Sequence, residues 1–222
     1  MRFLPITLLM AGLLTAGGCG GSGPSEEQAV AAIKKLDGKV KVNNEKKVST
    51  VNLGERDISD ADLANLKPLT QLRVLDIGKT NITDAGLAHL SGLTGLQKLT
   101  LHNTAITDAG LAHLKPLASL QELDLRETGI TDAGLENLAG LTKLNFVNLD
   151  KTKVSGAGLS NFKGLSQLSV LLLDDTPLDD AGLANLKGLP KLKRLTARDT
   201  KVTDDGAKSF REAMPKVELL HP

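Results

Sequence analysis

An eleven-residue phrase recurs along this chain at a fixed interval of 24 residues. The phrase TNITDAGLAHL begins at Thr80, and TAITDAGLAHL, which differs from it at one position, begins at Thr104. Weaker copies begin, without any insertion between them, at Arg56, Thr128, Thr152, Thr176 and Thr200. A constant period of this length with regularly spaced leucines predicts a solenoid, because one unit alone cannot bury its leucines and stacked units can.

Each unit is predicted to contain a short strand, a turn, a short helix and a return segment. Leu99 and Leu101 alternate with polar residues, which is the spacing of a half-buried strand, and the leucines that follow change to helical spacing. Thr107 and Asp108 fit the start of that helix, because a hydroxyl can cap free N–H groups and a carboxylate favours the positive end of the helix dipole.

A glycine occupies the same place near the start of six predicted helices. These glycines are Gly86, Gly110, Gly134, Gly158, Gly182 and Gly206, while the first copy has Asp62 in this slot. Glycine inside a helix costs about 1 kcal/mol relative to alanine. Its repeated use predicts a close approach of neighbouring coils, where a Cβ would clash, although duplication of one unit explains the pattern nearly as well.

These features resemble the leucine-rich-repeat family over roughly residues 48–222. The IT-D-x-G-L half of each unit is similar to the cysteine-containing and GALA-type subclasses, with threonine, as at Thr104, where those subclasses carry cysteine or asparagine. The resemblance implies an α/β solenoid with a curved parallel sheet on its concave side and short helices on its convex side. The F-box that accompanies the subclass in eukaryotes has no room in this chain.

Residues 1–18 have the features of a secretory signal peptide. Arg2 precedes an apolar stretch, which is shorter than the ~20 residues that span a bilayer, and small residues precede Cys19. Cys19 is the single cysteine, so no intramolecular disulfide can form, and it resembles the lipid-attachment cysteine of a bacterial lipoprotein, although Ala16 replaces the usual leucine. We expect an exported, membrane-anchored lipoprotein, periplasmic or at the cell surface; ordinary secretion is the alternative.

The rest of the chain divides into four predicted parts. Residues 19–24 are a flexible tether, 25–47 an N-terminal cap of helix and strand, 48–216 seven repeats, and 217–222 the end of a C-terminal cap. Ser25 and Gln28 fit a capping box at the start of the cap helix. Near the other end, FREAMPKVELL lengthens the repeat spacing by one residue.

Composition argues against several function classes. The 27 basic and 26 acidic residues give a net charge of +1, which provides no electrostatic case for nucleic acid binding. Four Phe, no Tyr and no Trp leave few stacking platforms for sugars or single strands. We expect no cofactor.

Candidate chemistry is sparse. His89 and His113 share one repeat slot on the predicted helical side, but no third ligand is evident, so we expect no metal site. His102 is predicted on the concave face without a serine or cysteine nucleophile beside it, so we expect no catalytic residues.

The concave face carries the only nonrandom functional pattern. Aligning the copies gives three outward-pointing columns, in which Phe146, Val170 and Leu172 are neighbours and are expected to be exposed. Charged residues surround them, and apolar residues with a charged rim are typical of an interaction patch. The candidate partner-binding residues are Lys98, His102, Glu122, Arg126, Phe146, Asp150, Val170, Leu172, Asp174 and Arg198.

Two simpler interpretations of the patch remain. Arg126 with Asp150, and Asp174 with Arg198, could form structural cross-strand ion pairs, or the apolar residues could be drift on a tolerant surface. We interpret the chain as a noncatalytic, monomeric module that presents its concave surface to an unidentified protein ligand. The alternative is an envelope polysaccharide or peptidoglycan binder, and an enzyme is a third class.

Overall fold

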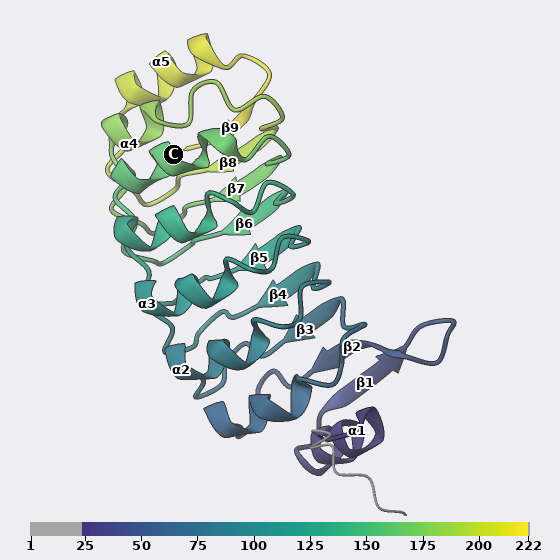
Figure 1. Cartoon of the computed structure of the whole chain (residues 1–222). Coiled ribbons are helices and arrows are strands. Elements are labelled where there is room, and N and C mark those ends of the chain that lie inside the picture. Colours follow the sequence, from purple (N-terminus) through teal and green to yellow (C-terminus); the bar gives the residue numbers. More distant parts are fainter. Residues whose placement is uncertain (1–23, 222) are drawn as a thin grey trace, which may run out of the picture.

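The structure is a computed structural model that describes residues 24–221, in which nine strands form one continuous sheet in chain order. Figure 1 shows the coils stacked along one axis, with the strands on one side and the short helices on the other. This is the α/β solenoid that the repeat predicts. The strands are β1 (Lys39–Val42), β2 (Val48–Asn52), β3 (Val74–Asp76), β4 (Lys98–Thr100), β5 (Glu122–Asp124), β6 (Phe146–Asn148), β7 (Val170–Leu172), β8 (Arg194–Thr196) and β9 (Glu218–Leu220).

The convex side consists of short α- and 3-10 helices. The α-helices are α1 (Glu26–Lys35), α2 (Asp84–Leu87), α3 (Asp108–Leu111), α4 (Asp180–Ala184) and α5 (Asp204–Ala213). The 3-10 helices are η1 (Asp60–Leu66), η2 (Ala88–Leu90), η3 (Ala112–Leu114), η4 (Asp132–Leu138) and η5 (Ala157–Gly164). None of the helices formed by residues 24–221 is long and apolar enough to cross a membrane.

The repeat interval sets the sheet register. From β2 to β9 the strands are parallel, and residues 24 apart pair, so Leu99 lies between Leu75 and Leu123. All three leucines are completely buried in one core that continues from the first coil to the last. Burying a leucine side chain contributes about 1.5–3 kcal/mol, so the core shared between coils holds the stack together.

The N-terminal segment covers the first coil. Ser25 and Gln28 form the expected capping box: the Gln28 amide donates to Ser25 Oγ at 3.2 Å, and the Ser25 amide donates to Gln28 Oε1 at 2.8 Å. Ile33 of α1 is buried against the core, and β1 pairs antiparallel with β2. At the other end, the lengthened spacing is confined to the segment between α5 and β9, since the pairing of Arg194 with Glu218 restores the interval.

A ladder of aspartates joins the coils on the convex side. Asp84 Oδ1 accepts the Thr107 amide at 2.8 Å, and Asp84 Oδ2 accepts the Thr107 hydroxyl at 2.5 Å. Asp108 does the same for Thr131. The predicted capping role of the Thr107 hydroxyl is therefore wrong, because that hydroxyl bonds to the preceding coil and makes no cap hydrogen bond.

The same aspartates explain four of the six repeated glycines, and at Gly158 and Gly182 a Cβ would instead meet the backbone of the preceding coil. A Cβ on Gly110 would lie 2.3 Å from Asp84 Oδ1, and a Cβ on Gly134 would lie 2.3 Å from Asp108 Oδ1. Real Cβ atoms do not approach so closely, so the predicted close approach of neighbouring coils is confirmed. Asp62 is tolerated in the first copy, where its carboxylate instead accepts the Ser59 amide at 2.8 Å.

The ladder is interrupted once, between the fifth and sixth copies. Gly156 stands in the aspartate slot with a left-handed backbone at φ +113°, and Asp179 stands in the slot of the hydroxyl donor. Asp179 turns to its own helix and accepts the Gly182 amide at 2.8 Å. An aspartate at position 156 would place its carboxylate against that of Asp179. Glycine at position 156 avoids this repulsion, so the two substitutions in the ladder compensate each other.

Candidate functional site

The concave face has the three columns of side chains that the repeat predicts. Phe146 lies between Glu122 and Val170 in the first column. Leu172 lies beside Asn148 in the second column, one coil further along. Phe146, Val170 and Leu172, here called the apolar cluster, are therefore neighbours at the C-terminal half of the sheet.

The apolar cluster is half-buried, and the prediction that its members are exposed is wrong. Side chains on a tightly stacked parallel sheet cover one another, because strands lie only about 4.8 Å apart. The more exposed large apolar residues in the described chain are Val42, at 56%, and Leu220, at 38%. Leu220 continues the column of Leu172 across Thr196, and sequence reasoning missed it because the last segment was treated only as a cap.

Most charges on the concave face from β4 to β9 are paired between adjacent coils. Lys98 Nζ lies 2.6 Å from Glu122 Oε2, and Arg194 Nε donates to Glu218 Oε2 at 2.9 Å. The predicted pair of Asp174 and Arg198 is confirmed, with Arg198 Nε donating to Asp174 Oδ2 at 2.9 Å.

The alternative interpretation of Arg126 and Asp150 as a structural ion pair is wrong. No hydrogen bond or ion pair joins their side chains in the described structure. Asp150 Oδ1 instead accepts the Asp174 amide at 2.8 Å, and Arg126 Nε is buried without a hydrogen-bond partner. These two residues follow β5 and β6, immediately beside the apolar cluster.

The environment of Asp150 disfavours its charge. Burial raises the pKa of Asp150 to about 6, and the carboxylates of Asp174 and Asp124 add to the effect. The Asp174 amide and the Arg126 guanidinium oppose the rise without cancelling it. Asp174 differs: burial raises its pKa, but the hydrogen bonds from Arg198 outweigh that effect, and its pKa is lowered.

A recurrent left-handed turn positions the third column. The residue after each member of this column has positive φ although it is not glycine, and its amide donates to the next coil, as Glu127 does to Asp150 O at 3.0 Å. Only glycine, asparagine and aspartate adopt this conformation readily, so residue type did not reveal it. The residues in this slot are Glu55, Lys79, Asn103, Glu127, Lys151, Asp175 and Asp199.

His102 lies at the N-terminal half of the face. Its ring packs over Gly78, where a Cβ would lie 2.5 Å from the ring, and its Nδ1 is 3.7 Å from Asp124 Oδ2. Among residues 24–221, no three His, Cys, Asp or Glu side chains converge as a metal site would require. His89 and His113 lie on η2 and η3, on the opposite side from His102. Cys19 lies outside the described residues.

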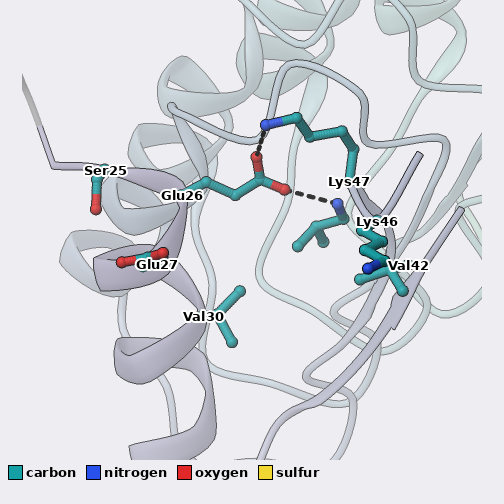
Figure 2. Close-up of a pocket in the computed structure, with 8 residues that line it drawn as sticks. Ser25, Glu26, Glu27, Val30, Val42, Lys46 and Lys47 are labelled. Atoms are coloured by element: carbon teal, nitrogen blue, oxygen red, sulfur yellow. Dashed lines mark hydrogen bonds and ion pairs between the residues drawn. The ribbon is translucent and has the colours of Figure 1, made fainter.

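A separate hollow of about 510 Å³ lies at the N-terminal cap, between α1 and the β1–β2 hairpin. Figure 2 shows Val30 and Val42 lining it, with Glu26 joined to Lys47 and to the Val48 backbone. The Glu26–Lys47 distance is 3.2 Å. These contacts hold the helix to the hairpin, so we interpret this hollow as a seam of the cap.

Comparison with known proteins agrees with this architecture. The family model described as "Leucine-rich repeat region" matches residues 47–221. Internalin C2 from Listeria monocytogenes superimposes with a TM-score of 0.62 at 22% identity, covering 87% of this chain and 92% of that one. An internalin (inlF) from the same species gives a TM-score of 0.63 at 21% identity, covering 89% of this chain and 62% of that one. At this identity the likeness shows the fold alone. No curated protein matches the sequence.

Proposed function

Because this chain belongs to the leucine-rich-repeat proteins, we propose that it is a noncatalytic module that binds a protein partner through the C-terminal half of its concave face. The observation that carries the proposal is the apolar cluster of Phe146, Val170 and Leu172. Sheet positions that face solvent are ordinarily polar, and a cluster of apolar side chains with a charged rim is typical of a protein interface.

Attachment to a bacterial envelope membrane is part of the same proposal. A signal peptide over residues 1–18 would direct export, and a lipid on Cys19 would hold the protein at the membrane. Residues 19–24 would act as the tether to a cap that begins at residue 25. The partner would then be a periplasmic or cell-surface protein.

Site-specific photocrosslinking in the producing cells tests the binding face. A photoreactive phenylalanine analogue replaces Leu172 in the cluster, and the matched control carries it at His113 on η3. We expect a discrete crosslinked protein from position 172 and none from position 113. Equal crosslinking from both positions, or crosslinking to glycan alone from position 172, would contradict a protein-binding concave face; the second result would support an envelope-polysaccharide binder.

A further inference from the structure

On the concave face from β4 to β9, there is one place where charged side chains lack an ion-pair partner. In the described structure, Arg126 and Asp150 have no ion-pair partner within 4 Å, and Asp124 has only His102, at 3.7 Å, which is charged only when it is protonated. The repeat positions of Arg126 and Asp150 are adjacent, one coil apart. Buried or half-buried charges are stable only when paired, so this place is one that a ligand can complete.

Arg126 and Asp150, which lack an ion-pair partner, lie near the apolar cluster. Phe146 and Asp150 are four residues apart in one coil, which is roughly 13 Å along an extended chain. Leu172 lies on the next coil and pairs with Asn148, which is two residues before Asp150, so Leu172 is roughly 8 Å from Asp150. A ligand that contacts both Asp150 and the apolar cluster would need a polar and an apolar group roughly 8–13 Å apart. Two to four residues of extended peptide provide this separation.

The charges around Asp150 determine which polar group of a ligand can bind there. Asp174 is neutralised by Arg198, and Asp124 lies near His102. Asp150 and Asp124 remain, against Arg126 alone, because His102 beside Asp124 is charged only when it is protonated. The site is therefore net negative and complements a cation.

Building on the proposed function, we infer that the partner segment carries a lysine or arginine two to four residues from a large apolar side chain. The cation binds the Asp150 carboxylate, and the apolar side chain packs on Val170 and Leu172.

Proton binding to Asp150 competes with such a cation. Burial raises the pKa of Asp150 to about 6, and the charged groups that face this carboxylate are Asp124 and Arg126 from the β5 coil, Asp174 from the β7 coil and Arg198 from the β8 coil. At pH 7.5 Asp150 is almost fully ionised, and at pH 5 about a tenth of it is. Affinity for the cation should therefore fall by up to about tenfold between these values.

Selection from a display library of random linear peptides tests the inference on the full-length protein. At pH 7.5 the wild-type chain should enrich peptides with lysine or arginine near an apolar residue. Asp150→Asn should lose the preference for the cation and keep the apolar preference, whereas Asp175→Asn, the matched control, should select as the wild type does.

A coupling measurement on one selected peptide without histidine or acidic residues gives the sharper result. Replacing its lysine by acetyl-lysine should weaken binding to the wild type by about 5- to 20-fold and to Asp150→Asn by less than about twofold. Lowering the pH from 7.5 to 5 should weaken wild-type binding by up to about tenfold and leave Asp150→Asn unchanged.

The failures are separable. If selected peptides depend on Val170 but show no preference for a cation, or if that preference survives Asp150→Asn, the inference is overturned and the proposed function stands. If the wild-type chain enriches no peptide that Val170→Asp abolishes, the concave face does not bind linear segments and the inference is overturned; the proposed function fails as well only if position 172 gives no crosslinked protein.

Discussion

At the scale of single residues, an ionised carboxylate at position 150 opposes folding. The pKa of Asp150 is raised mainly by burial, so the folded protein binds the proton more tightly than the unfolded chain does. The stability that this proton contributes is present below pH ~4 and is lost as the pH rises to about 6. A residue that costs stability at neutral pH, beside a half-buried apolar cluster, fits a role in binding better than a role in folding.

Asp150→Asn should therefore stabilise the protein at pH 7. We expect a gain of about 1–2 kcal/mol in the free energy of unfolding, less than the full linkage value because the carboxylate is half exposed and solvent screens it. The amide oxygen can still accept the Asp174 N–H. Urea unfolding at pH 7 and pH 4.5 measures this gain, which should shrink at the lower pH. Asp175→Asn, an exposed neighbour, should change stability by less than about 0.5 kcal/mol; a destabilised Asp150→Asn would contradict this account.

The sequence predicts the placement of these residues better than their bonds. The 24-residue period alone assigns Phe146, Val170 and Leu172 to neighbouring positions, and the sheet register agrees. The Arg126–Asp150 ion pair, one of the simpler interpretations of the patch, does not form, because the Asp174 amide competes for the carboxylate and register does not fix rotamers. Burial of the cluster was likewise underestimated, because it depends on how closely the coils stack.

At the scale of elements, the contacts between coils on the convex side depend on glycine. Most ladder aspartates reach the next coil through space that a Cβ would fill, as at Gly134 beside Asp108. The repeated glycine was visible in the sequence, and a close approach was predicted from it. The sequence does not reveal which atom approaches the glycine, because Asp108 fits a favourable interaction with the dipole of its own helix as well as it fits an acceptor for Thr131.

Gly134→Ala should thus be destabilising. The added Cβ displaces the Asp108 carboxylate from Thr131, and we expect a loss of about 1–3 kcal/mol in the free energy of unfolding. Gly140→Ala is the matched control, since a Cβ there meets no atom within 4 Å. The control should be neutral or stabilising by up to about 1 kcal/mol. Equal costs at both positions in urea unfolding would show that the close approach is not what requires glycine.

At the scale of the whole molecule, the proposed anchor and the proposed binding face lie at different parts of the solenoid. The chain enters at α1, beside the first coil, whereas the apolar cluster belongs to β6 and β7. Parallel strands separated by about 4.8 Å place those coils roughly 20 Å or more from the first. A tethered solenoid would therefore present its binding face away from the attachment point.

Cys19→Ser should release the protein from membranes, because serine has no thiol to carry the proposed lipid. Fractionation of cells that produce each form, with detection of the protein in membrane and soluble extracts, measures the change. The wild type should be retained in the membrane fraction and Cys19→Ser should be soluble. Equal partition of the two forms would contradict the lipid anchor and leave the binding face untouched.

The most direct test of the binding face compares two valines of one column. Val170 and Val74 are both half-buried and occupy the same repeat slot, but Val170 lies beside Phe146 and Val74 lies beside Thr50 and Lys98. The measurement is the affinity of Val170→Asp and Val74→Asp for the protein crosslinked at position 172, with unfolding midpoints recorded for both. We predict that Val170→Asp weakens binding by about tenfold or more while Val74→Asp weakens it by less than about twofold, at similar unfolding midpoints. Equal affinities for the two variants would contradict a binding site at the apolar cluster.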